Sequence, residues 1–321
     1  MTTVVRDHDA PQESRIWLAP VATVAAYVAV IGLIGDIRLE HVIVASLTIG
    51  LGVIGGKARR FMVDMTPYLV LAVGYDMVRY VREAVVVRPE QVLGCGLRNA
   101  ELALFSIAPG VTPQDWLTAH HVAPLDLLAA VPYFGFIYIA FGYAGYLFFK
   151  DRPRMRKYLW SLTVANYIAF VMYVVVPAAP PWYLRMHGCQ IDLAALPNPA
   201  GLARVDELLG ISYFQSFYSR SSSVFGALPS MHCAFPVLGL LTAWKSTTWK
   251  TRWIHIAYAM LMFFAAVYLD HHWIIDAIAG WIVAVTAVVL VSWVFRRRLG
   301  DERVTSSKPD PRQLDVATSH F

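Results

Sequence analysis

Two short segments in the last third of the chain carry histidines in surroundings that suit chemistry on a phosphate. The first, FGALPSMHCAFP at 225–236, contains Pro229, Ser230 and His232. Proline suits the first turn of a helix, because its missing N–H group costs nothing there. We therefore expect a helix to begin at Pro229 and to point its free N–H groups at an anion such as a phosphate.

The second segment, LDHHWIIDAIAG at 269–280, contains His272 and Asp276 four residues apart. On a helix that begins there, this spacing puts both side chains on one face. A carboxylate that accepts one ring N–H fixes the tautomer, so the other ring nitrogen keeps a lone pair for attack on phosphorus. We expect His272 to be the nucleophile and His232 the general acid that protonates the leaving oxygen. His271 lies about 100° around that helix from His272 and is given a supporting role at most.

The composition indicates what kind of protein holds these groups. Of the 321 residues, 57% are hydrophobic and 15% are charged, which is more apolar surface than a soluble domain needs. The net charge of +5 comes from short basic blocks between apolar runs, which is not the pattern of a nucleic-acid surface. We expect an integral membrane protein that binds no nucleic acid. The three cysteines lack metal-ligand spacing, and a disulfide between Cys95 and Cys189 is left open.

Apolar windows predict the helices that would cross a hydrocarbon core of about 30 Å. They lie at 17–35, 42–56, 61–81, 127–149, 158–176, 229–244, 253–271 and 274–295. The expected fold is an all-α integral membrane protein with about eight transmembrane helices, a six-helix catalytic core and interfacial helices on the outer face. We expect N-terminal transmembrane helices at 1–60, a catalytic membrane domain at 61–299 and a disordered cytoplasmic tail at 300–321.

Basic residues near the ends of these helices predict the orientation of the chain, because positive charge stays on the cytoplasmic side. Four blocks follow the second, fourth, sixth and eighth predicted helices, at 57–60, 150–157, 245–252 and 296–298. All four then lie on one side, so both termini are expected in the cytoplasm. The long loops at 82–126 and 177–228, which are candidate functional segments, and the active site are expected on the non-cytoplasmic face.

The proline-rich segment PAAPPWY at 177–183 is expected to end the fifth helix, because consecutive prolines cannot continue it. Trp182 and Tyr183 would then lie at the lipid interface, where such rings are enriched.

The pairing of PSMH at 229–232 with HWIID at 272–276 resembles the second and third signature motifs of the phosphatidic acid phosphatase type 2 superfamily. Further segments resemble the inositol phosphorylceramide synthase branch: PAAPPWY at 177–183, GLARVDELLG at 201–210, FGALPSMH at 225–232 and YLDHHWIIDAIAG at 268–280. The resemblance implies a membrane enzyme that works through a phosphohistidine without a metal. It also implies that His232, His272 and Asp276 form the catalytic triad, with His272 as nucleophile. We expect no cofactor.

One superfamily motif is missing. The first signature, a lysine seven residues before an Arg-Pro pair, does not occur, because Arg152-Pro153 lacks that lysine and lies on the predicted cytoplasmic side. We expect Arg204 and Arg220, in an outer loop, to make charge-assisted contacts with the phosphate, with Arg185 as a weaker candidate. The predicted substrate-binding residues are Ser230, Arg204, Arg220 and Gly226.

The leading hypothesis is a phosphotransferase of sphingolipid metabolism. It would move a phospho-headgroup, such as phosphoinositol from phosphatidylinositol, through His272 to the hydroxyl of a lipid acceptor such as ceramide. The alternative is a phosphatase that uses the same triad on phosphatidic acid or a polyprenyl phosphate, with water as acceptor. Two other classes stay open: a hydrolase in which the triad binds a metal, and a transporter that uses ionisable groups as a relay. The position of these groups at one face argues against the transporter.

Overall fold

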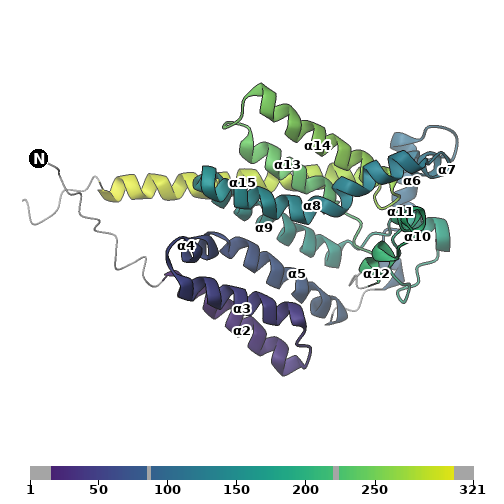
Figure 1. Ribbon diagram of the computed structural model, residues 1–321. Coiled ribbons are helices and arrows are strands. Elements are labelled where there is room, and N and C mark those ends of the chain that lie inside the picture. Colours follow the sequence, from purple (N-terminus) through teal and green to yellow (C-terminus); the bar gives the residue numbers. More distant parts are fainter. Residues whose placement is uncertain (1–15, 85–87, 220–223, 307–321) are drawn as a thin grey trace, which may run out of the picture.

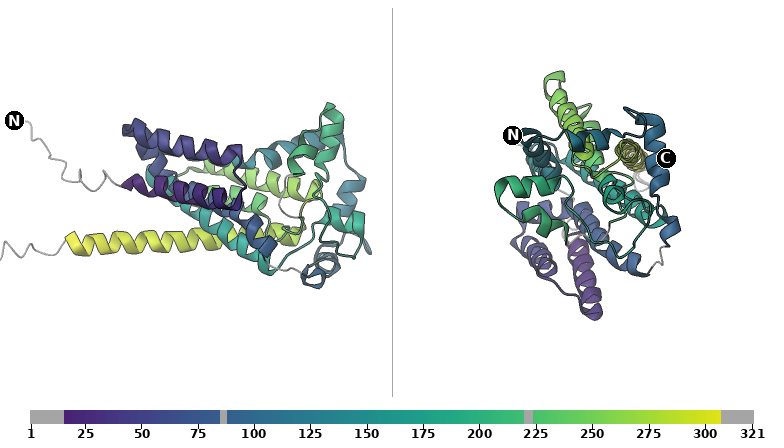
Figure 2. Two further views of the ribbon diagram at one scale, coloured as in Figure 1. Left: turned by 90° about the horizontal axis from the view of Figure 1, so that it is seen from below. Right: turned by 90° about the vertical axis from the view of Figure 1, so that its right-hand side faces the viewer.

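The computed structural model of the protein describes residues 16–84, 88–219 and 224–306. Within these ranges the chain is helical, with isolated bridges in place of β-strands. Long helices run side by side, and a group of short helices gathers at one end of them (Figures 1 and 2). The all-α fold predicted from the sequence is confirmed.

Five of the described helices form the main bundle, in which α13 packs against each of the other four. Their bounds are α8 (Ala123–Lys150), α9 (Arg152–Val175), α13 (Met231–Ala243), α14 (Trp249–Tyr268) and α15 (Ile274–Ser306). Small side chains such as Ala144, Ala165 and Ala284 are fully buried between them. Small residues allow helix backbones to approach closely, as is common in membranes, so the bundle holds α13 firmly.

The N-terminal part consists of α2 (Leu18–Ile34), α3 (Leu39–Ile54), α4 (Gly56–Asp64) and α5 (Thr66–Ala84). α5 packs on α9, and α2 packs on α5. Asp76 of α5 accepts a hydrogen bond of 2.6 Å from the Tyr27 hydroxyl and pairs with Arg38. These polar contacts attach the α2–α3 hairpin to α5, which in turn forms one wall of the cavity described below.

Short helices form what we call the end layer, on the right of Figure 1. Its members are α6 (Cys95–Phe105), α7 (Pro113–Ala119), α10 (Pro181–His187), α11 (Leu202–Leu209) and α12 (Tyr213–Tyr218), with the 3-10 turn η1 (Pro89–Gln91). A disulfide joins Cys95 to Cys189, whose Cα atoms are 5.4 Å apart. The pairing that the sequence left open is therefore present, and it ties α6 to the segment after α10.

Every one of the eight apolar windows overlaps a helix, but the helices differ in length. Four are long and apolar enough to cross a membrane, and a fifth span results if α4 and α5, bent by 49° at their break, count as one. Three more apolar helices, α2, α3 and α13, are shorter. α15 continues to Ser306, past residue 300 where the predicted tail would start, and 307–321 lie outside the described residues.

Two local predictions are corrected. α9 ends at Val175, just before PAAPPWY, as expected, but Trp182 and Tyr183 are only 5% and 0% exposed and do not face lipid. They pack in the core of the end layer, where the Tyr183 hydroxyl donates to the carbonyl of Gln190. Pro229 does not lie in the first turn of α13, because Ser230 is the N-cap and the helix begins at Met231.

Candidate active site

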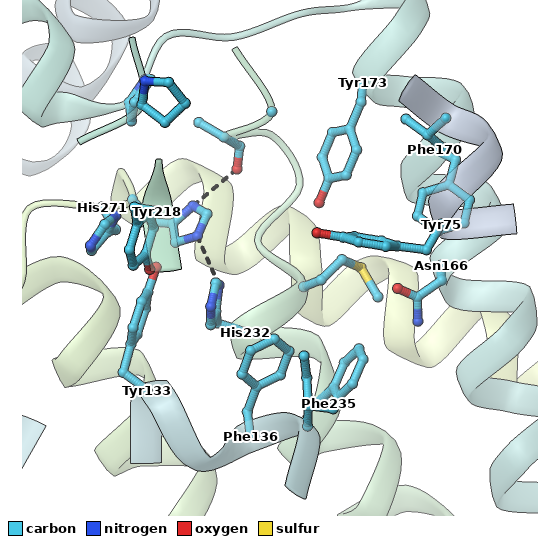
Figure 3. A pocket seen from close by; sticks show the side chains of 18 of the residues that line it. Tyr75, Tyr133, Phe136, Asn166, Phe170, Tyr173, Tyr218, His232, Phe235 and His271 are labelled. Atoms are coloured by element: carbon cyan, nitrogen blue, oxygen red, sulfur yellow. Dashed lines mark hydrogen bonds between the residues drawn. The ribbon is translucent and has the colours of Figure 1, made fainter. Parts of the chain in front are cut away.

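A cavity of ≈ 420 Å³ lies where α13 meets the end layer. Its walls come from α5, α8, α9 and α13, and His232 and His271 lie along one side (Figure 3). His272 also lines the cavity. The other lining side chains are mostly aromatic or aliphatic, including Phe136 and Phe170. Among the described residues that line it, none is a lysine or an arginine. An apolar cavity with a few convergent polar groups is typical of a site for a lipid-like ligand.

The two predicted catalytic histidines are in direct contact. Nδ1 of His232 lies 3.3 Å from Nε2 of His272, and Nδ1 of His272 lies 3.0 Å from the carbonyl oxygen of Ala227 (dashed lines in Figure 3). A carbonyl oxygen can only accept, so Nδ1 of His272 carries the hydrogen and Nε2 carries the lone pair. His232 is then the donor in the contact between the rings. This arrangement gives His272 the form of a nucleophile and His232 the form of a proton donor.

Asp276 lies behind His272, with Oδ2 3.6 Å from Nδ1. That distance is an ion-pair contact, so the tautomer is fixed mainly by the Ala227 carbonyl, which the sequence could not indicate. Oδ2 also accepts the N–H of Trp273 at 2.9 Å, while Oδ1 is buried and has no hydrogen-bond partner among the described residues. His272 precedes α15 and is not part of it. The carboxylate is placed to stabilise positive charge that develops on His272.

The Ala227 carbonyl is itself held by paired backbone segments. Gly226 forms a parallel bridge with Ala178, which also bridges to Leu93. The N–H of Ala227 donates to the carbonyl of Ala178 at 3.2 Å, and the N–H of Ala178 donates to the carbonyl of Phe225 at 3.0 Å. These contacts connect the PAAPPWY and FGALPSMH segments, which the sequence showed only as separate motifs. Gly226 also lines the cavity, as its predicted binding role requires.

The start of α13 is joined to α15 at the backbone. The N–H of Ser230 donates to the carbonyl of Asp276 at 2.9 Å, so it is not free to bind an anion as expected. The Ser230 side chain caps α13 by accepting from the N–H of Cys233, and it is fully buried. The N–H groups of Met231 and His232 have no backbone acceptor inside α13, as is usual in the first turn of a helix. Ser230 therefore positions His232.

Gly280 is where α15 approaches this turn most closely, and we predict that Gly280→Ala lowers turnover by roughly 10²-fold. A Cβ atom at Gly280 would lie 2.1 Å from the carbonyl oxygen of Ser230, so the start of α13 would have to move with His232. Turnover per folded enzyme is the measurement. Gly142→Ala is the matched control, because a Cβ there meets nothing within 4 Å. Wild-type turnover in Gly280→Ala would show that the close approach does not position His232.

Aromatic rings pack on His232 and His271. The ring of Tyr133 stacks on His232 at 3.9 Å between centroids and on His271 at 5.0 Å, and Tyr218 also stacks on His271 at 4.9 Å. Nε2 of His271 lies 3.0 Å from the carbonyl oxygen of Pro199 and must carry the hydrogen. Burial lowers the pKa of His271 to about 3. His271 is therefore neutral at pH 7 and supports its neighbours without supplying a charge for phosphate.

Two of the predicted cationic residues, Arg204 and Arg185, do not line the cavity. The guanidinium of Arg204 pairs with the buried carboxylate of Asp126 at 2.7 Å. Arg220 lies outside the described residues, although Tyr218 and Val224 on either side of it both line the cavity. No described contact tests a phosphate-binding role for either arginine.

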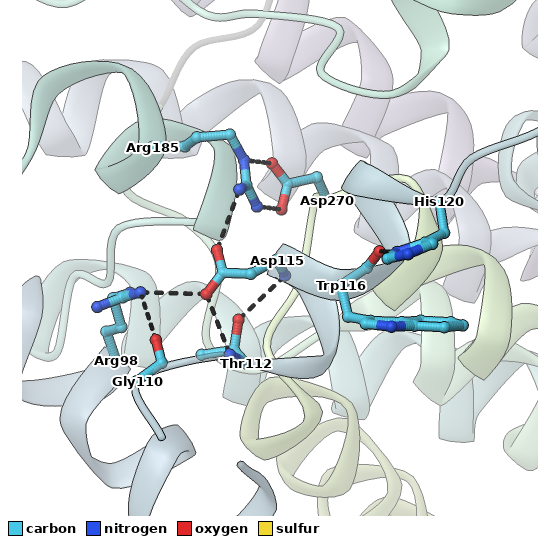
Figure 4. A network of polar contacts seen from close by, with 8 residues as sticks. All are labelled: Arg98, Gly110, Thr112, Asp115, Trp116, His120, Arg185 and Asp270. Carbon is cyan, nitrogen blue, oxygen red and sulfur yellow. Dashed lines mark hydrogen bonds and ion pairs between the residues drawn. The ribbon is translucent and has the colours of Figure 1, made fainter. Parts of the chain in front are cut away.

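Arg185 instead belongs to an ionic network in the end layer (Figure 4). Its Nε and Nη2 atoms each donate to Asp270 at 2.9 Å, and Nη1 donates to Asp115 at 3.0 Å. Asp115 also pairs with Arg98 at 3.1 Å. Asp270 has a positive φ of 63°, which is unusual for a residue with a side chain. Arg185 thus holds the turn that presents His271 and His272.

The triad does not have the geometry of a metal site. His232 and Asp276 approach different ring nitrogens of His272, so the three side chains do not converge on one point. Within the described ranges, no cluster of three or more histidine, cysteine, aspartate or glutamate side chains could hold a metal ion.

Other contributors to the site were missed from the sequence. The Ala227 carbonyl cannot be read from residue types, and Tyr133 looks like any aromatic residue of an apolar helix. Glu101 and Gln114, which contact the start of α15, could have been noticed, because Glu101 is a lone carboxylate in the apolar run ELALF.

The chain is similar to several known proteins. The family model described as "PAP2 superfamily" matches residues 100–290. A phosphoinositol dihydroceramide synthase of Bacteroides thetaiotaomicron is 33% identical over 267 residues, which cover 81% of this chain and 84% of the relative. Inositol phosphorylceramide synthase of Candida albicans is 34% identical over 191 residues, or 57% of this chain and 40% of the relative. The catalytic subunit of inositol phosphorylceramide synthase of Saccharomyces cerevisiae is 34% identical over 181 residues, or 56% and 45%. No solved structure matches the chain.

The fold and the site define a class: an apolar helical bundle with paired histidines and a carboxylate beside an apolar cavity. The chain belongs to the PAP2 superfamily, whose model covers more than half of it, including His232, His272 and Asp276. It spans most of the bacterial relative but less than half of each fungal one.

Proposed function

We propose that the protein transfers phosphoinositol from phosphatidylinositol to the hydroxyl of a ceramide-type lipid. The observation that carries the proposal is the contact between Nδ1 of His232 and Nε2 of His272 at the edge of an apolar cavity. The names of the bacterial and fungal relatives support this choice of donor and acceptor. The chain is accordingly an enzyme, a lipid phosphotransferase.

The geometry supports a two-step reaction. The reaction begins with His232 as the imidazolium. In the first step Nε2 of His272 attacks phosphorus and the bond to the glyceride oxygen breaks. That oxygen takes the Nδ1 proton of His232, which becomes neutral, and leaves as diacylglycerol. Asp276 stabilises the positive charge on the ring of His272. In the second step His232 removes the proton of the acceptor hydroxyl, whose oxygen attacks phosphorus and releases His272. Atoms and protons then balance, and the triad returns to its first state.

The cavity favours a lipid acceptor over water. Whichever hydroxyl stands opposite His272 receives the phosphoinositol, so its local concentration decides the product. The lining of the cavity includes Leu71 and Val78 of α5 and Ile137 of α8. Apolar side chains hold hydrocarbon well and water poorly. Hydrolysis of a lipid phosphate by the same triad is the alternative.

Product analysis tests the choice. The purified enzyme is incubated in mixed micelles with inositol-labelled phosphatidylinositol and a ceramide. We expect the label mainly in a new sphingolipid, with little free inositol phosphate and no effect of a chelator. Release of inorganic phosphate from phosphatidic acid or a polyprenyl phosphate, with no use of any lipid alcohol, would replace transfer by hydrolysis.

We also propose that the chain crosses the membrane eight times, with the four long helices, the α4–α5 pair and the shorter helices α2, α3 and α13 as spans. In this arrangement residues 1–60 add N-terminal spans to a catalytic domain at 61–299, whose six-helix core is α5, α8, α9, α13, α14 and α15, and the segment after 300 is a cytoplasmic tail.

The end layer and the active site would then face the non-cytoplasmic side. The disulfide between Cys95 and Cys189 supports this orientation, because disulfides persist in oxidising compartments. The ends of α8 and α13 with their basic blocks lie at the other end of the bundle, as do the start of α2 and the end of α15 (Figures 1 and 2).

Labelling of single introduced cysteines tests this topology. Leu196, 81% exposed in the end layer, and Trp249, 69% exposed at the start of α14, are suitable positions. On intact cells an impermeant maleimide should label a cysteine at Leu196 and leave one at Trp249 unlabelled until lysis. The reverse pattern would overturn the orientation.

We propose that Arg220 contacts the phosphate directly. The positive charge of Arg204 would attract the phosphate from a greater distance. Arg220→Gln should lower kcat/KM for the donor roughly 10- to 10²-fold, the effect of losing one charge-assisted hydrogen bond. Arg88→Gln, on an exposed side chain, is the control. Arg204→Gln should first reduce the amount of folded enzyme, because Asp126 would stay buried without its partner. An Arg220→Gln enzyme with unchanged kcat/KM would remove Arg220 from the site.

A further inference from the structure

Glu101 of α6 is a fully buried carboxylate that faces the start of α15. Oε1 accepts the N–H of Ile274 at 2.8 Å, and Oε2 accepts the N–H of Ile275 at 3.2 Å. These are the first two residues of α15. Their N–H groups have no acceptor inside their own helix, so a carboxylate from another helix supplies it.

Gln114 of α7 extends the same contact to the nucleophile. Its Nε2 donates to Oε1 of Glu101 at 2.8 Å and lies 3.3 Å from the carbonyl oxygen of His272. Gln114 is also fully buried. One carboxylate and one carboxamide therefore hold the backbone from His272 to Ile275. We call Glu101 and Gln114 the clamp.

Two carboxylates, Asp276 and Glu101, accept the backbone N–H groups around the start of α15. Asp276 accepts the N–H of Trp273, and Glu101 accepts the next two N–H groups. A helix start attracts negative charge, so without Glu101 the carboxylate of Asp276 would be the nearest anion for all three groups. Asp276 would then turn toward the helix and away from His272.

We propose that Glu101, acting with Gln114, is a positioning residue that keeps Asp276 and the ring of His272 in line for the reaction. The inference rests on the proposed function only in taking His272 as the nucleophile. Burial raises the pKa of the Glu101 carboxyl, although the bonds from Gln114 and the two backbone N–H groups oppose the shift. A buried carboxylate costs stability unless it is well hydrogen-bonded. The carboxylate of Glu101 accepts hydrogen bonds from Gln114 and from the start of α15.

Glu101→Gln is the main test. The variant keeps the shape of the side chain but replaces one oxygen by an NH₂ group, which cannot accept from a backbone N–H. We expect kcat to fall roughly 10²-fold, the effect of a displacement of about an ångström at a reacting group, with KM for phosphatidylinositol little changed. Amide hydrogen exchange at Ile274 and Ile275 should become faster. Glu207→Gln, an exposed carboxylate in the same layer, is the control for both measurements.

The exchanged pair Glu101→Gln/Gln114→Glu separates positioning from a simple need for one buried charge. It keeps the composition and the net charge, but it puts a carboxylate oxygen against the carbonyl of His272. We expect no recovery of kcat. Recovery to near the wild-type value would overturn the proposal.

Two other results would overturn it as well: wild-type kcat in Glu101→Gln, or a loss of activity that matches the loss of folded protein with unchanged turnover per folded molecule. Hydrogen exchange does not depend on substrate. A wild-type enzyme that used a different donor would contradict the proposed function and leave this test intact.

Discussion

His272→Ala should lower turnover by roughly 10⁴- to 10⁶-fold, the scale of the loss when the nucleophile of a covalent mechanism is removed. The remaining groups can still bind donor and acceptor. However, His232 cannot replace the nucleophile, because its Nδ1 carries the hydrogen that points at His272 and it lacks the carboxylate partner. The measurement is transfer of labelled inositol to ceramide per folded enzyme.

The control for this result is His271→Ala. His271 is adjacent in sequence and equally buried, but its Nε2 is bonded to the carbonyl of Pro199 and it makes no direct contact with Asp276. It should lose far less turnover than His272→Ala. Near-normal turnover in His272→Ala would remove the nucleophile assignment.

His232→Ala should lower turnover by roughly 10²- to 10⁴-fold, the usual contribution of general acid–base catalysis. The loss is smaller than for His272 because the nucleophile and its carboxylate remain. The glyceride oxygen is a poor leaving group and needs a proton as the bond to phosphorus breaks. The same comparison of labelled transfer per folded enzyme measures the effect.

The leaving group allows this role to be separated from simple packing. A nitrophenyl ester of inositol phosphate releases a stable anion, so its reaction with His272 needs no proton from His232. With this donor the burst of nitrophenol should be nearly restored in His232→Ala. An equally slow burst would mean that His232 acts by position and not as an acid, since its ring also packs against Tyr133 and Phe136.

The sequence was informative about the helices and the triad because those signals are local. Apolar runs long enough for a span mark the helices wherever they pack, and each predicted window does overlap one. His272 and Asp276 are four residues apart, so they remain close even though α15 begins only at Ile274 and the helical face invoked for them does not include His272. Their approach to His232 followed from the resemblance to the superfamily motifs.

The remaining features depend on contacts between distant segments. Trp182 and Tyr183 look like interfacial anchors in sequence. In the structure they are enclosed by the segments that the Cys95–Cys189 disulfide joins and by the paired backbone at Ala178. Arg204 looks like a free cation until Asp126, 78 residues away, is seen beside it. The Ala227 carbonyl is a backbone group, which carries no residue-type signal. Glu101 is visible in the sequence as a lone carboxylate, but its partners are backbone N–H groups of a distant segment.

Trapping the covalent intermediate tests the central claim most directly. The purified enzyme is mixed with inositol-labelled phosphatidylinositol in the absence of ceramide, quenched in alkali and digested, and the labelled peptide is sequenced by mass spectrometry. We predict an acid-labile phosphoinositol group on His272, which disappears on addition of ceramide as labelled sphingolipid forms at the same rate. If sphingolipid forms at the normal rate with no labelled histidine, or with the label on another residue, transfer through His272 is contradicted.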